Sequence, residues 1–397
     1  MTSVGVGISQ NASFQTAFQE ALSQSLRHFR NQSPDIVFLF ADTSYPQEEL
    51  AAYAKKKLPE RTLLVGASAP SLFTKKGIIE KSLGVVAIKS WSMTFDTAFA
   101  PLQKEDPYQS GKNLVGSLPY VHIAPKLYML LYDGLNTYGQ KVINGVTSQL
   151  GIHFPIIGIS SSDNFRFRET YQYFQHKAFQ HSAIGVSISG TFSFGIGVRH
   201  GWTPVGAFGT VTKAFGGKVY EIDNKPAIDF YRSFFDQKID LFSHSSFSQP
   251  AVTYPLGVSV DTSSKLVIRT PYRFHSDGSI EFVTEVPTHT KVHLMIGSND
   301  ESLSTTTMAV RQAKDVLTNA NPYFAFVFSG LMRKKHLGRK NQEDILHLSQ
   351  ELGSIPFLGI HGYAQIGPLY GQTYGTPSVV HNESVIVVIL AEETKRL

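Results

Sequence analysis

Three times along the chain, a short apolar run precedes a longer helix-like segment and then a second apolar run that contains a glycine. The three pairs of runs are residues 36–40 and 62–68, 127–131 and 154–160, and 324–328 and 355–361. Continuous apolar runs of this length are typical of strands that are covered on both faces. The connecting lengths suit crossover helices, so we predict that the two strands of each pair run parallel.

The sequences around these pairs also repeat. Apolar residues with helical spacing precede the first and third pairs: Phe14, Phe18, Ala21, Leu22 and Leu26, then Leu303, Val310, Ala313 and Leu317. Strand-like segments at 4–8 and 291–296 come before those two helices, and hairpin-like sequences follow each pair at 82–99, 170–188 and 379–390. We therefore predict an α/β protein with layered mixed sheets flanked by helices, built from repeated strand–helix–strand–hairpin units.

The segment between the second and third copies has a different pattern. Turn and strand signals at 200–213 are followed by Pro226, which starts a predicted helix over 227–235, and then by a polar, irregular stretch over 236–252. We place a domain boundary in that stretch. The expected domains are residues 1–240, with a duplicated α/β unit, and residues 241–397, with one further copy.

Composition excludes several classes of function. The chain has no cysteine, which rules out disulfides, thiolate metal sites and cysteine nucleophiles, and agrees with a reducing cytoplasm. The formal net charge is only +5, and no basic run is long enough for a nucleic-acid or lipid patch. Neither a signal peptide nor a membrane-spanning apolar stretch is recognisable. We expect a soluble cytoplasmic protein with no nucleic-acid or membrane partner.

Polar residues at strand ends are the best candidates for a site, because ligands of open α/β sheets bind beyond the carboxyl ends of the strands. Ser68, Ser160 and His361 each stand two residues after the glycine of their repeat, and Ser160 begins a polar run that reaches Asp163. These residues either hold a ligand or satisfy backbone groups of their own turns.

The third copy is richer in polar candidates. His361, Tyr363 and Gln365 alternate, so they share one face of a strand. Arg269, in a strand-like apolar context, needs either a ligand carboxylate or a structural acid as its partner. The predicted ligand-binding residues are Ser160, Asp163, Arg269, Ser329, Arg333, His361, Tyr363, Gln365 and Asn382. No catalytic or metal-binding motif is present, so we assign no catalytic residue and no metal ligand.

Taken together, these segments resemble the FIST (F-box and intracellular signal transduction) sensory domain family, in both its N-terminal and C-terminal parts. The resemblance runs from Val4 to Leu390. The segments that carry it are 64–68, 157–163, 198–204 with 211–213 and 226–227, 254–257, 267–269, 328–333, 356–359 and 381–382. Each is weak alone, and their order and spacing together are specific.

The chain also departs from the family pattern. Gly330 stands where relatives often carry cysteine, and neutral Gln365 replaces a glutamate of the family motif. A glutamate placed for a ligand amine or cation would lose its charge in this exchange, so the ligand of this chain is expected to differ.

The resemblance implies a sensory protein that binds a small molecule, with amino acids or related metabolites as the ligand class. No output module is recognisable, so we expect a stand-alone protein that signals through a separate partner. No cofactor is expected in this interpretation. Three alternatives stay open: a haem-based nitric oxide sensor, a hydrolase that uses a strand-end serine, and a scaffold without ligand.

Overall fold

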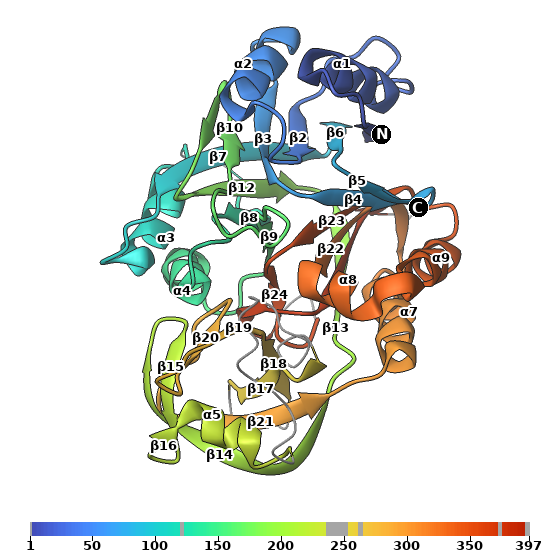
Figure 1. Ribbon diagram of the computed structural model, residues 1–397. Helices are drawn as coiled ribbons and strands as arrows, with labels where there is room; N and C mark the ends of the chain where they lie inside the picture. The colour runs from blue at the N-terminus through green and yellow to red at the C-terminus, as the bar shows by residue number, and fades with distance from the viewer. Residues whose placement is uncertain (1, 120–122, 236–252, 261–264, 372–374, 394–397) are drawn as a thin grey trace.

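The three predicted strand pairs form the centres of three separate six-stranded sheets (Figure 1). The structure is a computed structural model that describes residues 2–119, 123–235, 253–260, 265–371 and 375–393. All three pairs are parallel, as predicted: β2 (Ile36–Ala41) with β3 (Leu63–Ser68), β8 (Pro125–Tyr132) with β9 (Ile156–Ser160), and β22 (Ala320–Gly330) with β23 (Phe357–Gly362).

Each pair is extended in the same order by two antiparallel strands. The added strands are β6 (Leu83–Lys89) and β1 (Ser3–Ser9), β12 (Ser182–Gly190) and β7 (Met93–Pro101), and β26 (Val385–Glu393) and β13 (Ser193–Arg199). The predicted α/β class with mixed sheets is therefore confirmed. The expected first strand of the third unit, 291–296, is instead β21 (Lys291–Ile296) of a fourth sheet, and β13 takes its place.

Helices cover the outer faces of these sheets. The first unit carries α1 (Phe14–Ser25) and α2 (Gln47–Lys57), the second α3 (Pro107–Gly116) and α4 (Gly139–Leu150), and the third α7 (Asn299–Asp315), α8 (Leu331–Leu337) and α9 (Asn341–Leu352). None of the helices in the described part of the chain has the length and apolar character needed to cross a membrane.

The first and third units pack a helix against the edge strand in the same way. A Cβ at Gly5 would lie 1.8 Å from the carbonyl oxygen of Ser25 in α1. A Cβ at Gly195 would lie 1.8 Å from the carbonyl oxygen of Ala313 in α7. Only glycine allows a helix to approach its edge strand so closely, and both units use it at the same place.

Hairpins are exchanged between the units in a closed cycle. The hairpin β4 (Ser71–Thr74)–β5 (Gly77–Glu80) of the first unit joins β23 of the third. The hairpin β10 (Gln172–Phe174)–β11 (Lys177–Phe179) of the second joins β3 of the first. The hairpin β24 (Gln365–Pro368)–β25 (Ser378–His381) of the third joins β9 of the second.

The segments expected to pair as hairpins at 82–99, 170–188 and 379–390 do form strands, but that pairing was wrong. In each case the two strands enter different sheets, as β6 and β7 do. The hairpin of each repeat is instead one of the short exchanged hairpins, β4–β5, β10–β11 or β24–β25.

The fourth sheet lies at the far end of the molecule in Figure 1. Its strands are β14 (Thr203–Phe215), β15 (Lys218–Ile222), β16 (Lys225–Pro226), β17 (Leu256–Ser259), β18 (Leu266–Arg269), β19 (Pro271–Phe274), β20 (Ile280–Phe282) and β21. The helix predicted after Pro226 is α5 (Ala227–Arg232). The boundary expected near residue 240 lies outside the described residues.

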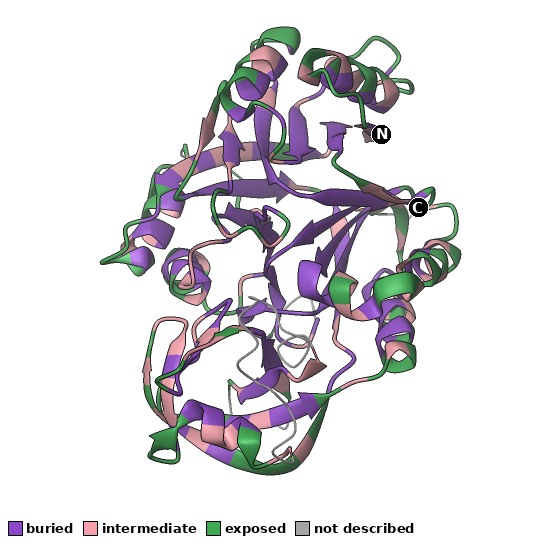
Figure 2. Ribbon diagram, viewed as in Figure 1, coloured by how far each residue is buried: buried purple, intermediate pink, exposed green. Residues whose placement is uncertain are grey.

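The inner faces of the first three sheets share one apolar core, which Figure 2 shows as continuous buried strands. Phe38 of the first unit and Phe326 of the third meet edge to face, with ring centroids 5.3 Å apart. The three sheets therefore form one body, and their strand ends come together near its middle.

Candidate functional site

The three strand ends singled out in the sequence are buried and bind the exchanged hairpins. Oγ of Ser68 accepts a hydrogen bond from the backbone N–H of Tyr171 at 3.0 Å, and Oγ of Ser160 accepts one from Ala364 at 2.8 Å. At the third end, Nδ1 of His361 lies 3.0 Å from Oγ of Ser71. Each side chain thus holds the hairpin that arrives from another unit.

Asp163 and Tyr363 are joined directly. The hydroxyl of Tyr363 donates to Oδ1 of Asp163, and the two carboxylate oxygens also accept backbone N–H groups of residues 167–169 at 2.8–3.1 Å. The carboxylate therefore organises the loop after β9 and ties it to the third unit.

Gln365 and Asn382 connect β24 and β25 to the neighbouring backbone. Oε1 of Gln365 accepts from the N–H of Ser384 at 3.2 Å, and Nδ2 of Asn382 donates to the carbonyl of Tyr363 at 3.3 Å. Ser329 is the parallel-strand partner of His361. A Cβ at Gly330 would lie 3.0 Å from Cα of Glu383, so the position where relatives often carry cysteine is tightly packed.

The two predicted arginines have separate surroundings. Arg333 forms a buried ion pair with Asp344 of α9 at 2.6 Å. Arg269 donates to the carbonyl oxygens of Glu285, Ile268 and Val380 at 2.9–3.0 Å, and burial lowers its pKa to about 10. The charge of Glu285 also acts on Arg269, and contact of Arg269 with a ligand carboxylate stays a prediction.

Six of the nine predicted residues are therefore linked around the ends of β9, β23 and β24: Ser160, Asp163, His361, Tyr363, Gln365 and Asn382. Ser329 lies beside them in β22, whereas Arg269 and Arg333 have their own partners. All nine are buried and bind protein groups or lie against them. Their contact with a ligand stays a prediction.

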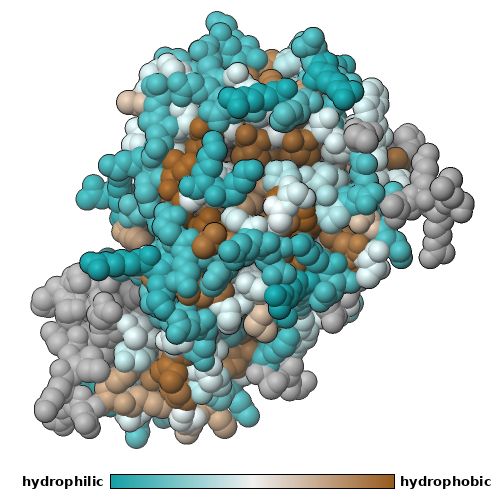
Figure 3. All heavy atoms as spheres, turned by 90° about the vertical axis from the view of Figure 1, so that its right-hand side faces the viewer, coloured by the Kyte–Doolittle hydropathy of each residue, from teal (hydrophilic) through white to brown (hydrophobic). Residues whose placement is uncertain are grey.

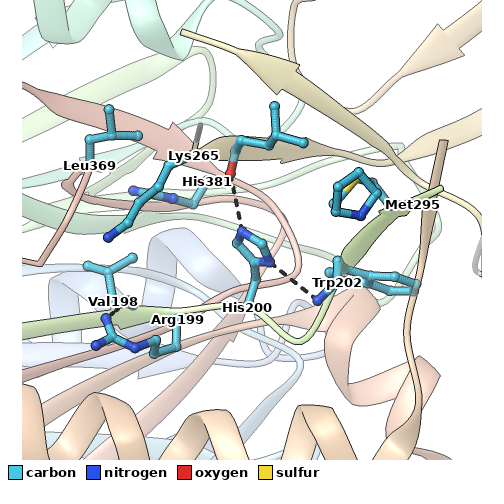
Figure 4. A pocket seen from close by; sticks show the side chains of 10 residues that line it. Val198, Arg199, His200, Trp202, Lys265, Met295, Leu369 and His381 are labelled. Carbon is cyan, nitrogen blue, oxygen red and sulfur yellow. Dashed lines mark hydrogen bonds between the residues drawn. The ribbon is translucent and has the colours of Figure 1, made fainter. Parts of the chain in front are cut away.

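An open pocket lies next to this cluster, where the end of β13 meets the fourth sheet (Figure 4). Its volume is about 390 Å³, within the range of small-molecule sites. Its wall consists of Val198, Arg199, His200, Trp202, Pro204, Lys265, Leu266, Met295, Leu369 and His381.

Two cations and two neutral histidines give the pocket its electrostatic character. Burial lowers the pKa of Arg199, and burial together with the charge of Arg199 lowers that of Lys265. Burial also lowers the pKa of His200 and brings that of His381 to about 3, so both imidazoles are neutral at neutral pH. None of the described residues lining the pocket is acidic.

The sequence pattern did not single out the pocket residues as a site; part of them belongs to the segment that carries the family resemblance. Residues 198–204 appeared there, but Lys265 gave no signal, because it lies in a distant strand-flanking position. The one signal for Arg199 in the sequence is a charged residue next to the glycine and tryptophan of that signature, Gly201 and Trp202.

His361 at the strand end and His200 in the pocket do not fit haem, which needs an imidazole nitrogen free in front of an open cavity. His361 is fully buried, bonded to Ser71, and packed against the ring of Phe73 at 4.7 Å. His200 lines the pocket, but Nε2 lies 3.2 Å from the carbonyl of Leu266 and Nδ1 accepts from Trp202.

Comparison with known proteins places these features in context. An uncharacterized protein of Methanocaldococcus jannaschii is 30% identical over 92 residues, which are 23% of this chain and 18% of that protein. The chain therefore spans under a fifth of the length of this relative.

Two solved structures align over nearly all of this chain. Cyanuric acid hydrolase from A. caulinodans has a TM-score of 0.38 at 8% identity, over 99% of this chain and 100% of the other. Phosphoribosylformylglycinamidine synthase II from Thermotoga maritima has a TM-score of 0.23 at 8% identity, over 99% and 72%. Likeness at this level supports no inference about function.

The family comparison covers most of the chain. The FIST N domain matches residues 35–225, and the FIST C domain matches residues 227–368. FIST domains are in general sensory domains of signalling proteins that bind small ligands, rather than catalytic domains. The chain belongs to the FIST family, and its pocket draws residues from both the FIST N and the FIST C domain.

Proposed function

We propose that this protein is a cytoplasmic sensor of a small anionic metabolite, which binds in the pocket between β13 and the fourth sheet. The observation that carries the proposal is that Arg199 and Lys265 both line one cavity whose described lining has no acidic residue. Cations in a partly buried pocket favour an anion, because a carboxylate or phosphate there forms charge-assisted hydrogen bonds with them.

The apolar part of the pocket supports a ligand with a hydrocarbon or ring body. Trp202 and Met295 lie on one side of the pocket, and Lys265, Arg199 and Leu369 lie on the other (Figure 4). An organic carboxylate fits this division, and so does an amino acid that directs its carboxylate inward. The absence of cysteine supports the cytoplasmic assignment.

The location of the pocket supports a sensory role. Its wall combines the end of β13 in the three-sheet body with β18 and β21 of the fourth sheet. A ligand that touches both parts favours the arrangement in which both sets of contacts are made. A separate signalling protein would then recognise that arrangement.

The test is a thermal-shift and calorimetry screen of the purified protein with organic acids, amino acids and the matching neutral amides. We expect carboxylates to raise the melting temperature, by the free energy RT ln(1 + [L]/Kd), and the amides to have no effect. Lys265→Gln should abolish the response.

Lys213→Gln serves as the matched control, because Lys213 is largely exposed on β14 and does not line the pocket. Equal responses to acids and amides, or an unchanged response in Lys265→Gln, would refute the proposal. Loss of the response in both variants would also count against it.

A further inference from the structure

A second cavity, of about 700 Å³, lies on a different face of the molecule, along the open edge of β1. Its wall is formed by β1, the end of α1, the β4–β5 hairpin and the segment after α9. Figure 3 shows this side of the molecule, where hydrophobic atoms gather between hydrophilic side chains. We call this cavity the β1 groove.

The edge of β1 offers backbone groups for pairing. Alternate residues of an antiparallel strand turn their N–H and C=O groups away from the partner strand. On the outer side, the N–H of Thr2 donates to Glu392 at 2.6 Å, and the N–H of Ile8 donates to Gln24 at 3.1 Å. Val4 and Val6 lie between them on the same side, and the described residues provide no strand there.

The corresponding edge of the second unit is filled by the chain itself. Phe99 of β7 packs against Phe174 at 5.8 Å and Phe179 at 4.2 Å, so the aromatic rings of β10 and β11 close that gap. At β1 the side chains of Val4, Val6 and Ile8 stay partly exposed. The β1 groove is therefore a gap that the described chain leaves open.

The positive charge of the β1 groove favours an acidic binding partner. Arg27, Lys75 and Lys76 line it together with His28, and none of its described lining residues is acidic. Its apolar wall includes Ile79, Ile355 and Phe357. An extended chain presents alternate side chains to opposite faces, so one row can meet apolar surface while the other meets the cations.

We propose that the β1 groove binds an extended peptide segment of a partner protein, with alternating apolar and acidic residues, as an added strand on β1. The backbone of the segment pairs with Val4 and Val6, its apolar side chains enter the groove, and its carboxylates meet Arg27, Lys75 and Lys76. This inference is independent of the metabolite pocket, because the two cavities share no lining residue.

The test uses a fluorescently labelled peptide that alternates valine and glutamate, and a matched peptide that alternates valine and lysine, without added metabolite. We expect fluorescence polarisation to detect binding of the acidic peptide only. Hydrogen exchange at the amides of Val4 and Val6 should slow in its presence.

Two pairs of variants separate the backbone and charge contributions. Val6→Pro removes the outward N–H, a change that an edge strand tolerates, and should abolish binding, whereas Val6→Ala should retain it. Reversing Lys75 and Lys76 to glutamate should weaken binding at least tenfold, and the same reversal of the exposed Lys56 and Lys57 on α2 should not.

Three results would overturn the proposal. These are equal binding of the acidic and basic peptides, unchanged binding by Val6→Pro, and concentration-dependent dimerisation that Val6→Pro abolishes. The last result would assign the groove to a second copy of the chain.

Discussion

Oγ of Ser71 lies 3.0 Å from Nδ1 of His361, which joins the first hairpin of the chain to the last central strand. Nζ of Lys334 lies 3.1 Å from the same oxygen. An ammonium group has only donors, so Oγ of Ser71 accepts a hydrogen bond from Lys334. Burial, together with the charges of Lys334 and Arg333, lowers the pKa of His361 well below 6.5, so its imidazole is neutral at neutral pH.

Removing this hydroxyl should weaken the junction. Ser71→Ala removes the hydrogen-bond partner of Nδ1 of the buried His361, which we expect to lower the free energy of unfolding by about 1–3 kcal/mol. Urea denaturation at pH 7.5 measures the change. Ser117→Ala, at an exposed position at the end of α3, should have no measurable effect, and an equal loss in both variants would contradict the assignment.

Acid should destabilise the protein through its buried histidines. Burial lowers the pKa of His361 well below 6.5 and that of His381 from 6.5 to about 3. Below pH 6.5 these histidines are protonated in the unfolded chain but stay neutral in the folded chain. The free energy of unfolding therefore falls by about 1.4 kcal/mol for each histidine with every pH unit of acidification. Unfolding measured between pH 7 and 5 should show a shallower slope in His381→Gln, and the slope of exposed His153→Gln should match the parent.

Glu383 should produce the opposite slope. Burial raises its pKa from 4.5 to about 8, and among the described residues only Oε1 has a partner, the hydroxyl of Thr270 at 2.6 Å. Between these two values the folded state keeps a proton that the unfolded chain loses, so stability falls as the pH rises. Glu383→Gln should remove about 1.4 kcal/mol per pH unit of that dependence between pH 5 and 8. An unchanged slope would show that the carboxyl is ionised in the fold.

Arg333 and Asp344 should behave as one buried unit. Removing either partner leaves an unpaired charge, so Arg333→Met and Asp344→Leu should each cost about 3–5 kcal/mol of stability. The double variant should lose much less than the sum, and a thermodynamic cycle from urea denaturation measures this coupling. Additive losses would point to a role for Arg333 outside the ion pair.

The local sequence pattern predicted the features that depend on residues close together in the chain, namely the strands and their parallel pairing. The apolar runs around Phe38, Met129 and Phe326 are strands, and their parallel pairing follows from the crossover lengths. The pairing of β4 with β23 was not predictable, because Leu72 and Ile360 become neighbours only when distant units meet. For the same reason β13 was not recognised as the first strand of the third unit, since the whole fourth sheet separates it from α7.

The candidate site was predictable in part. The glycine spacing indicated that Ser68, Ser160 and His361 end equivalent strands, and the structure brings these ends together. The pattern could not tell a ligand contact from a junction between units, because both need the same polar side chains at a strand end. Arg199 and Lys265 share a pocket only through the docking of β18 beside β13, which neither local segment encodes.

The cyclic exchange of hairpins constrains how the chain is made on the ribosome. The hairpin over residues 71–80 emerges early, yet its strand partner at 357–362 is among the last segments to be synthesised. Likewise, β3 has no partner on its outer edge until residues 172–174 are synthesised, and β9 has none until residues 365–368 are synthesised. A chain that stalls before its third unit is complete presents unpaired strand edges to the cell, which makes premature termination an aggregation hazard.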